Sequence, residues 1–103
     1  MTEAHVSIVC LLDEQERVRR TAEVLDLFKR RLATHELTDG FEVEFPADTA
    51  ASVLDFILFE RECCPFFDFA LQFEADQGPM RLRIGGPPGA KEMIEELLAQ
   101  TNS

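Results

Sequence analysis

Two adjacent cysteines followed by a proline, Cys63-Cys64-Pro65, are the residues of this sequence best suited to chemistry. Thiolates are soft ligands that suit Zn²⁺, Cu⁺ and comparable thiophilic ions such as Hg²⁺. Glu60 precedes the two cysteines by three and four residues, so on a helix its carboxylate lies one turn from both. The third cysteine, Cys10, is distant in sequence and would have to be brought close by the fold. We therefore predict a soft-metal site with Cys63 and Cys64 as ligands and with Cys10 or Glu60 as a third.

Two other interpretations of the cysteines remain open. A buried cysteine often serves as a small apolar side chain, and this applies most directly to Cys10 because it lies in an apolar segment. An adjacent pair can also form a strained disulfide reversibly, which would give the protein a redox role. The acidic neighbours Glu62 and Asp68 disfavour the reactive thiolate that such a role needs, as does the partial negative charge at a helix C-terminus.

No other motif predicts catalysis. His5 and His35 are isolated, and neither belongs to a recognisable Cys–His nucleophile motif. The segment 85–92 is rich in glycine, but it lacks the second glycine and the Ser/Thr of a phosphate-binding loop. The carboxylates are spread over predicted helix and strand faces and do not form an acid–base pair. We therefore expect a non-enzymatic protein.

The hydrophobic pattern predicts the elements that must position these residues. Apolar runs and alternation predict strands over residues 6–12, 41–45, 67–73 and 80–84, and a period near 3.6 predicts helices over residues 14–33, 48–63 and 90–99. Residues 34–40 are predicted to be a polar connection, and the last two strands are predicted to form an antiparallel hairpin. The order β-α-β-α-β-β-α predicts one two-layer α+β domain over residues 1–103, with helices covering the single apolar face of a sheet.

The two longer predicted helices differ in their surfaces. The helix over residues 14–33 has one apolar stripe, formed by Val18, Ala22, Leu25, Phe28 and Leu32. Its other surface has six basic residues and is typical of a solvated face or of a surface that docks an acidic partner: Arg17, Arg19, Arg20, Lys29, Arg30 and Arg31. The helix over residues 48–63 is predicted to start with Asp48 as its N-cap and to end before Pro65. Its many apolar side chains indicate the most buried helix of the fold or a helix that contacts a partner chain.

Charge and composition exclude several classes of partner. The net charge of -10 repels phosphate backbones and anionic lipid surfaces, so we expect neither nucleic-acid nor membrane binding. The longest strongly apolar run covers residues 56–59, far short of the roughly 20 residues that a membrane span needs. The first residues show no signal-peptide pattern, and three cysteines without one indicate reduced thiols. We therefore expect a cytoplasmic protein.

The segments 60–69, ERECCPFFDF, and 78–92, GPMRLRIGGPPGAKE, resemble two sequence blocks of a small, uncharacterised bacterial protein family. In that family the first block is E-R-x-C-C-P-F-x-x-F and the second is G-P-x-x-L-x-I/L-x-G-P-x-G-x-K-E. Many members also have a cysteine-containing start followed by an arginine-bearing helix, to which the segment from Cys10 to Arg20 is similar. The family is loosely associated with heavy-metal, mercury-type resistance, so the resemblance implies a metal-related role with Cys63 and Cys64 as ligands.

The sequence thus supports two functional hypotheses. The first is a non-enzymatic accessory protein that binds or senses a thiophilic ion, Zn, Cu or Hg, through Cys63 and Cys64. The alternative is a homodimeric protein-interaction module that associates through its apolar second helix, with the cysteines only packing the core.

Overall fold

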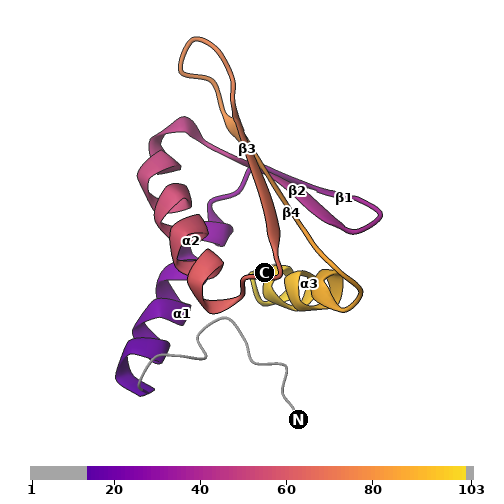
Figure 1. Ribbon diagram of the computed structural model, residues 1–103. Coiled ribbons are helices and arrows are strands. Elements are labelled where there is room, and N and C mark those ends of the chain that lie inside the picture. Colours follow the sequence, from indigo (N-terminus) through magenta and orange to yellow (C-terminus); the bar gives the residue numbers. More distant parts are fainter. Residues whose placement is uncertain (1–13, 102–103) are drawn as a thin grey trace.

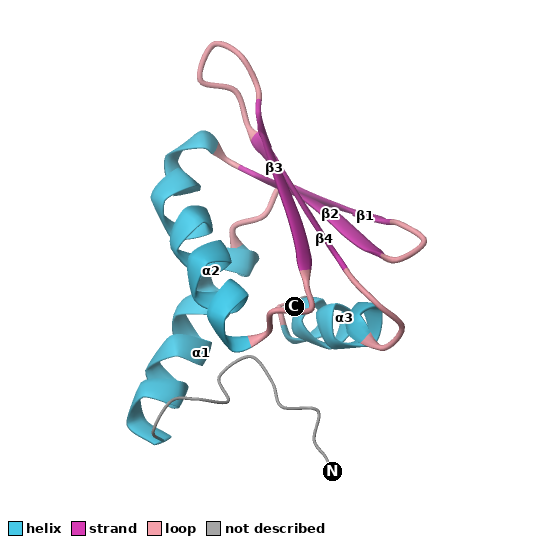
Figure 2. Ribbon diagram, in the orientation of Figure 1, coloured by secondary structure: helices cyan, strands magenta, loops and turns pink. Residues whose placement is uncertain are grey.

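The computed structural model describes residues 14–101, which form three helices on one side of a four-stranded antiparallel sheet (Figures 1 and 2). The strands lie in the order β1-β2-β4-β3. The elements are α1 (Glu14–Lys29), β1 (Ala33–Glu36), β2 (Gly40–Phe45), the 3₁₀ turn η1 (Ala47–Thr49), α2 (Ala50–Cys63), β3 (Asp68–Phe73), β4 (Met80–Gly85) and α3 (Ala90–Gln100). The mixed α+β class is therefore confirmed. The predicted strand over residues 6–12, with Cys10, lies outside the described residues.

Each central strand has one buried and one more open face, because successive side chains of a strand point to opposite sides. The buried face is formed by Phe41, Val43 and Phe45 of β2 and by Met80, Leu82 and Ile84 of β4. On the open face, Glu42 lies opposite Arg83 and Glu44 lies opposite Arg81. The helices cover the apolar face only, since Phe28, Val53, Phe56, Ile94 and Leu98 join the same core cluster. The predicted β3–β4 hairpin is confirmed, with Leu71 opposite Leu82.

The end of the first helix and the segment after it differ from the prediction. Helix α1 ends at Lys29 rather than near Ala33, because the N–H groups of Arg30 and Arg31 donate to carbonyls only three residues back. The next N–H, that of Leu32, donates to the carbonyl of Glu44 at 2.6 Å, so the chain has already joined the sheet. Residues 33–36 then form β1 instead of a polar connection. This strand is an edge strand with three exposed residues, so it carries no apolar alternation that a sequence pattern would reveal.

The buried face of α1 is also shifted from the predicted stripe. Val24, Leu27 and Phe28 are buried, whereas Val18 and Leu32 are 62% and 58% exposed. The first turns of α1 extend past the sheet and its other helices (Figure 1), and Leu32 lies beyond the end of the helix. Only the second half of the helix therefore contributes to the core.

Helix α2 begins differently from the prediction and ends as predicted. Asp48 lies in η1 and does not cap α2; its carboxylate accepts a hydrogen bond from Arg30 at 2.9 Å instead. The helix ends at Cys63, and Cys64 has φ -132° and ψ 74°, which is not helical. The proline at position 65 explains this end, because it disfavours helical geometry in the residue before it.

None of the helices in the described part of the chain is long and apolar enough to cross a membrane.

Candidate thiol and carboxyl site

The two cysteines lie in a tight turn that joins α2 to β3. The N–H of Cys64 still donates to the carbonyl of Glu60 at 2.7 Å, and the N–H of Phe67 donates to the carbonyl of Cys64 at 3.2 Å. Cys64 is buried, with 2% of its surface exposed, and Cys63 is half-buried. One thiol therefore faces the interior while the other remains accessible from solvent.

A row of phenylalanines connects this turn to the centre of the core. The ring of Phe56 contacts that of Phe28 at 5.2 Å between centroids and that of Phe69 at 6.1 Å, in both cases edge to face. Phe69 in turn contacts Phe67, also at 6.1 Å. Edge-to-face pairs are worth about 0.5–1.5 kcal/mol each beyond their buried area, so the end of the turn at Phe67 is held by packing as well as by hydrogen bonds.

The loop between β4 and α3 packs against the same turn. A Cβ atom placed on Gly86 would lie 3.0 Å from the carbonyl oxygen of Phe66 and 3.0 Å from the Cβ of Ala90. Gly85, one residue earlier, is paired with Asp68 at the start of β3. The two sequence segments 60–69 and 78–92 are therefore neighbours in space. The glycine-rich loop is a packing element of the cysteine turn, and its Ala90 is buried at the start of α3.

Glu60 is the most unusual ionisable group near the turn. It is 1% exposed, and none of the described residues donates a hydrogen bond to either of its carboxylate oxygens. The side chain lines a cavity of about 20 Å³ whose other lining residues are apolar: Phe56, Phe67, Phe69, Ile84, Met93, Ile94 and Leu97. Burial in these surroundings raises the pKa of Glu60 from 4.5 to about 8, and the positive charge of Arg20 opposes this shift. The folded protein therefore keeps Glu60 mainly protonated at neutral pH.

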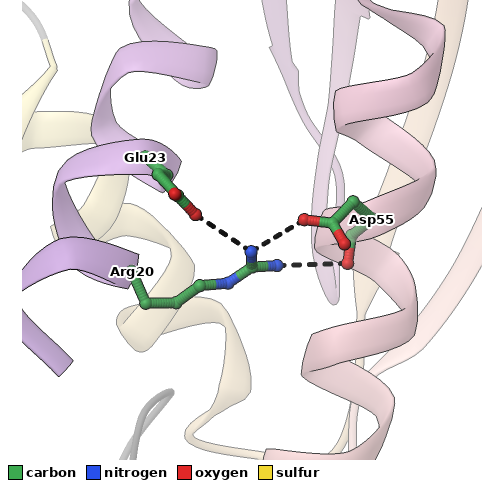
Figure 3. Close-up of polar contacts among 3 residues, drawn as sticks. All are labelled: Arg20, Glu23 and Asp55. Atoms are coloured by element: carbon green, nitrogen blue, oxygen red, sulfur yellow. Dashed lines mark hydrogen bonds and ion pairs between the residues drawn. The ribbon is translucent and has the colours of Figure 1, made fainter. Parts of the chain in front are cut away.

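Arg20 connects α1 to α2 beside this site (Figure 3). Its guanidinium donates to the carboxylates of Asp55 at 2.7 Å and Glu23 at 3.1 Å and to the backbone carbonyl of Asp55 at 3.2 Å. It also lies 4.2 Å from the centre of the Phe59 ring. The side chain is only 14% exposed, so the interpretation of the basic surface as a solvated face is wrong for Arg20. No sequence signal identified this residue, because Asp55 is 35 positions away.

The structure brings only some of the predicted ligands together. Glu60 and Cys63 lie in the last turn of α2, and Cys64 directly follows its end. Within residues 14–101, however, no three His, Cys, Asp or Glu side chains are grouped so that they could hold a metal ion. A complete ligand set would therefore need a donor from another part of the chain, and the predicted donor there is Cys10. His35 is exposed on β1, at the far edge of the sheet from β3.

What the described site can do follows from these three groups. Two neighbouring thiols can supply two sulfur ligands to a thiophilic ion, and the partial exposure of Cys63 gives such an ion a route in. The protonated Glu60 can donate a hydrogen bond or release its proton.

Comparison of the chain with protein-family models, with curated proteins and with solved structures finds no match.

Proposed function

We propose that this protein binds a thiophilic metal ion through the thiolates of Cys63 and Cys64, with Cys10 as the third ligand. The observation that supports the proposal most strongly is the buried Glu60 carboxyl, which lies three and four residues before the two cysteines and has no described hydrogen-bond donor. Buried polar groups nearly always have a partner, and an unmatched one calls for a bound ion, a water or a chemical role.

The protonation of Glu60 also removes an objection to thiolates at this position. An ionised carboxylate next to two thiolates would repel them, and the C-terminus of α2 adds a partial negative charge. Because Glu60 keeps its proton up to a pH of about 8, it contributes no negative charge at neutral pH. A neutral carboxyl can instead donate a hydrogen bond to a sulfur or, once an ion is bound, release its proton and become a further ligand.

The role that fits such a site is binding or sensing rather than catalysis. A vicinal thiol pair with one accessible sulfur suits an ion that is taken up and passed on, and soft ligands select Cu⁺, Zn²⁺ or Hg²⁺ over hard cations. The resemblance to bacterial proteins found in heavy-metal resistance settings agrees with this class of ion.

Native mass spectrometry of the reduced protein tests the proposal. The wild type is expected to retain one equivalent of Zn²⁺ or Cu⁺ in the presence of a competing thiol, and Cys63→Ser and Cys64→Ser are each expected to lose it. Cys10→Ser tests the third ligand, and Glu62→Gln, an exposed change on the same helix, is the matched control. Loss of the ion by the wild type under the same competition would refute the proposal.

A homodimeric interaction module is the second candidate, and one observation favours it. Leu54 and Leu58, one helical turn apart on α2, are 45% and 61% exposed although the opposite face of the same helix is buried. Exposed leucines at this spacing are typical of a helix that contacts a partner. In this interpretation the chain associates with a second copy, and its cysteines are packing residues.

A further inference from the structure

The outer edge of β3 is the longest unpaired edge of the described sheet. β3 pairs with β4 on one side, and no strand within residues 14–101 pairs with its other side (Figure 2). The opposite edge strand, β1, is shorter, four residues against six, and its Glu36 is tied to Lys91 of α3 by an ion pair of 2.6 Å. An edge strand without lysine, proline or a bulge is open to pairing with another strand, and β3 has none of these protections.

The hydrogen bonds of the hairpin show which backbone groups of β3 face outward. The N–H of Glu74 donates to the carbonyl of Pro79, which lies directly opposite it in the register of the hairpin. In an antiparallel pair, hydrogen-bonded and non-hydrogen-bonded positions alternate. Residues 68, 70 and 72 therefore bond to β4, while the N–H and C=O groups of Phe69, Leu71 and Phe73 point away from it. These three residues also direct their side chains to the apolar face, where Phe73 is still 57% exposed.

We propose that β3 pairs in antiparallel orientation with β3 of a second copy, about a two-fold axis at Ala70, so that two sheets join into one. The proposal deepens the second candidate function given above, because it assigns the dimer surface to the outer edge of β3. An isologous contact of this kind places the same surface on both copies.

Charge and side-chain size favour this register over the nearest alternative. Centred on Ala70, the pairing places Phe69 opposite the second copy's Leu71, Phe73 opposite its Phe67, and Asp68 opposite its Gln72. Centred on Leu71 instead, it would place Asp68 opposite Glu74 of the second copy, and directly opposed like charges are destabilising. At the axis itself the small Ala70 meets its own counterpart, so no bulky side chains face each other there.

The open face of the joined sheet brings no like charges directly opposite each other across the proposed contact. Ala70 lies beside Arg83 and Gln72 lies beside Arg81 within each copy. In the proposed register, one row across the strands contains Arg81 on β4, then Gln72 on β3, and then Asp68 on β3 of the second copy. In that row Arg81 has Gln72 on one side and Glu44 on the other, and Asp68 of the second copy lies one strand beyond Gln72.

Two lysine substitutions on the same face of β3 test the proposal. Ala70→Lys would place two lysines opposite each other at the axis, with Cβ atoms about 5 Å apart, and is expected to weaken association by about tenfold or more. Gln72→Lys adds the same charge beside the same kind of neighbour, an arginine of β4, but places it opposite Asp68 of the second copy. It is expected to leave the dimer intact.

The measurements are sedimentation equilibrium of the full chain and hydrogen exchange of the β3 amides. We expect a wild-type dimer in which the amides of Phe69, Leu71 and Phe73 are protected, and a folded Ala70→Lys monomer in which they exchange. A wild-type dimer with these amides exchanging freely would overturn the β3 assignment while leaving the homodimer candidate standing. A wild-type monomer would overturn both, and protected amides in that monomer would show that the chain's own residues cover the edge. Equal effects of the two lysines would refute the register.

Discussion

Replacing Glu60 by glutamine should change how stability depends on pH. Glutamine has nearly the same shape as glutamate but cannot ionise. In the wild type, burial raises the pKa of Glu60 to about 8 in the folded state, whereas the unfolded chain has the ordinary value of 4.5. Between these two values the folded state holds a proton that the unfolded state has lost. The stability of the wild type must therefore fall as the pH rises through this window.

The size of the effect follows from the two pKa values. Their separation corresponds to about 5 kcal/mol over the whole window, and to about 2.5 kcal/mol between pH 5 and pH 7. Other carboxylates add their own pH dependence, because the chain has a net charge of -10. The difference between the wild type and Glu60→Gln removes these shared contributions and isolates Glu60.

Urea unfolding at pH 5, 6, 7 and 8, followed by circular dichroism, measures this difference. Glu60→Gln is expected to gain stability relative to the wild type at each step toward pH 8. The matched control is Glu62→Gln, an exposed residue on the same helix, which should follow the wild-type slope. Parallel curves for the wild type and Glu60→Gln would show that the folded protein does not hold the Glu60 carboxyl neutral.

Three further predictions concern the stability of the fold. Arg20→Met should lower the free energy of unfolding by about 2 kcal/mol, because it removes charged hydrogen bonds to Asp55 and the contact with the Phe59 ring. The control Arg30→Met breaks an exposed ion pair with Asp48 and should lower it by about 0.5 kcal/mol or less, so equal losses in denaturant titrations would contradict the prediction. Gly40→Ala should prevent stable folding, since the added Cβ would overlap the carbonyl oxygen of Ile84; a cooperative thermal transition near that of the wild type would count against the β2–β4 pairing described here. Gln77→Gly should raise the free energy of unfolding by about 0.5–1 kcal/mol, and with it the urea midpoint, because Gln77 has φ +61° in the β3–β4 turn and glycine adopts such a φ without strain. An unchanged or lower midpoint would argue against that turn conformation.

The parts of the fold that the sequence predicted are those whose burial alternates. The predicted ends of β2, β3, β4 and α3 lie within one residue of the observed ends, because each element carries a regular apolar pattern with glycine or proline near at least one end. The end of α2 was predicted from Pro65 alone, since a proline restricts the residue before it whatever the rest of the fold does.

The parts that were missed depend on contacts between distant residues. β1 is polar and exposed, and only its pairing with β2 makes it a strand. Asp48 has the chemistry of a helix cap, but the nearby Arg30 binds its carboxylate. The ion pair between Arg20 of α1 and Asp55 of α2 requires the two helices to lie side by side, which no local sequence pattern shows (Figure 3).

For the candidate site, the sequence predicted where its residues lie along α2 but not their environment. Glu60 and Cys63 lie three residues apart in the last turn of α2, whereas Cys64 already has non-helical φ and ψ, so helix spacing does not fix the position of its side chain. The burial of Glu60 also has a sequence signal: Val53, Phe56 and Glu60 are separated by three and four residues, so Glu60 continues the buried stripe of α2. The raised pKa could not be predicted, because it depends on the apolar side chains that α3 and the sheet place around the carboxyl.

X-ray absorption of the Zn²⁺ or Cu⁺ complex, prepared at one equivalent in the presence of a competing thiol, identifies the atoms that bind the metal. The proposed site predicts two or three sulfur neighbours around the metal, at about 2.3 Å for Zn²⁺. It also predicts that Cys63→Ser and Cys64→Ser lower the sulfur count or abolish retention. A metal that is bound only by nitrogen and oxygen, or that the competing thiol removes, would contradict the claim and leave the cysteines as packing residues.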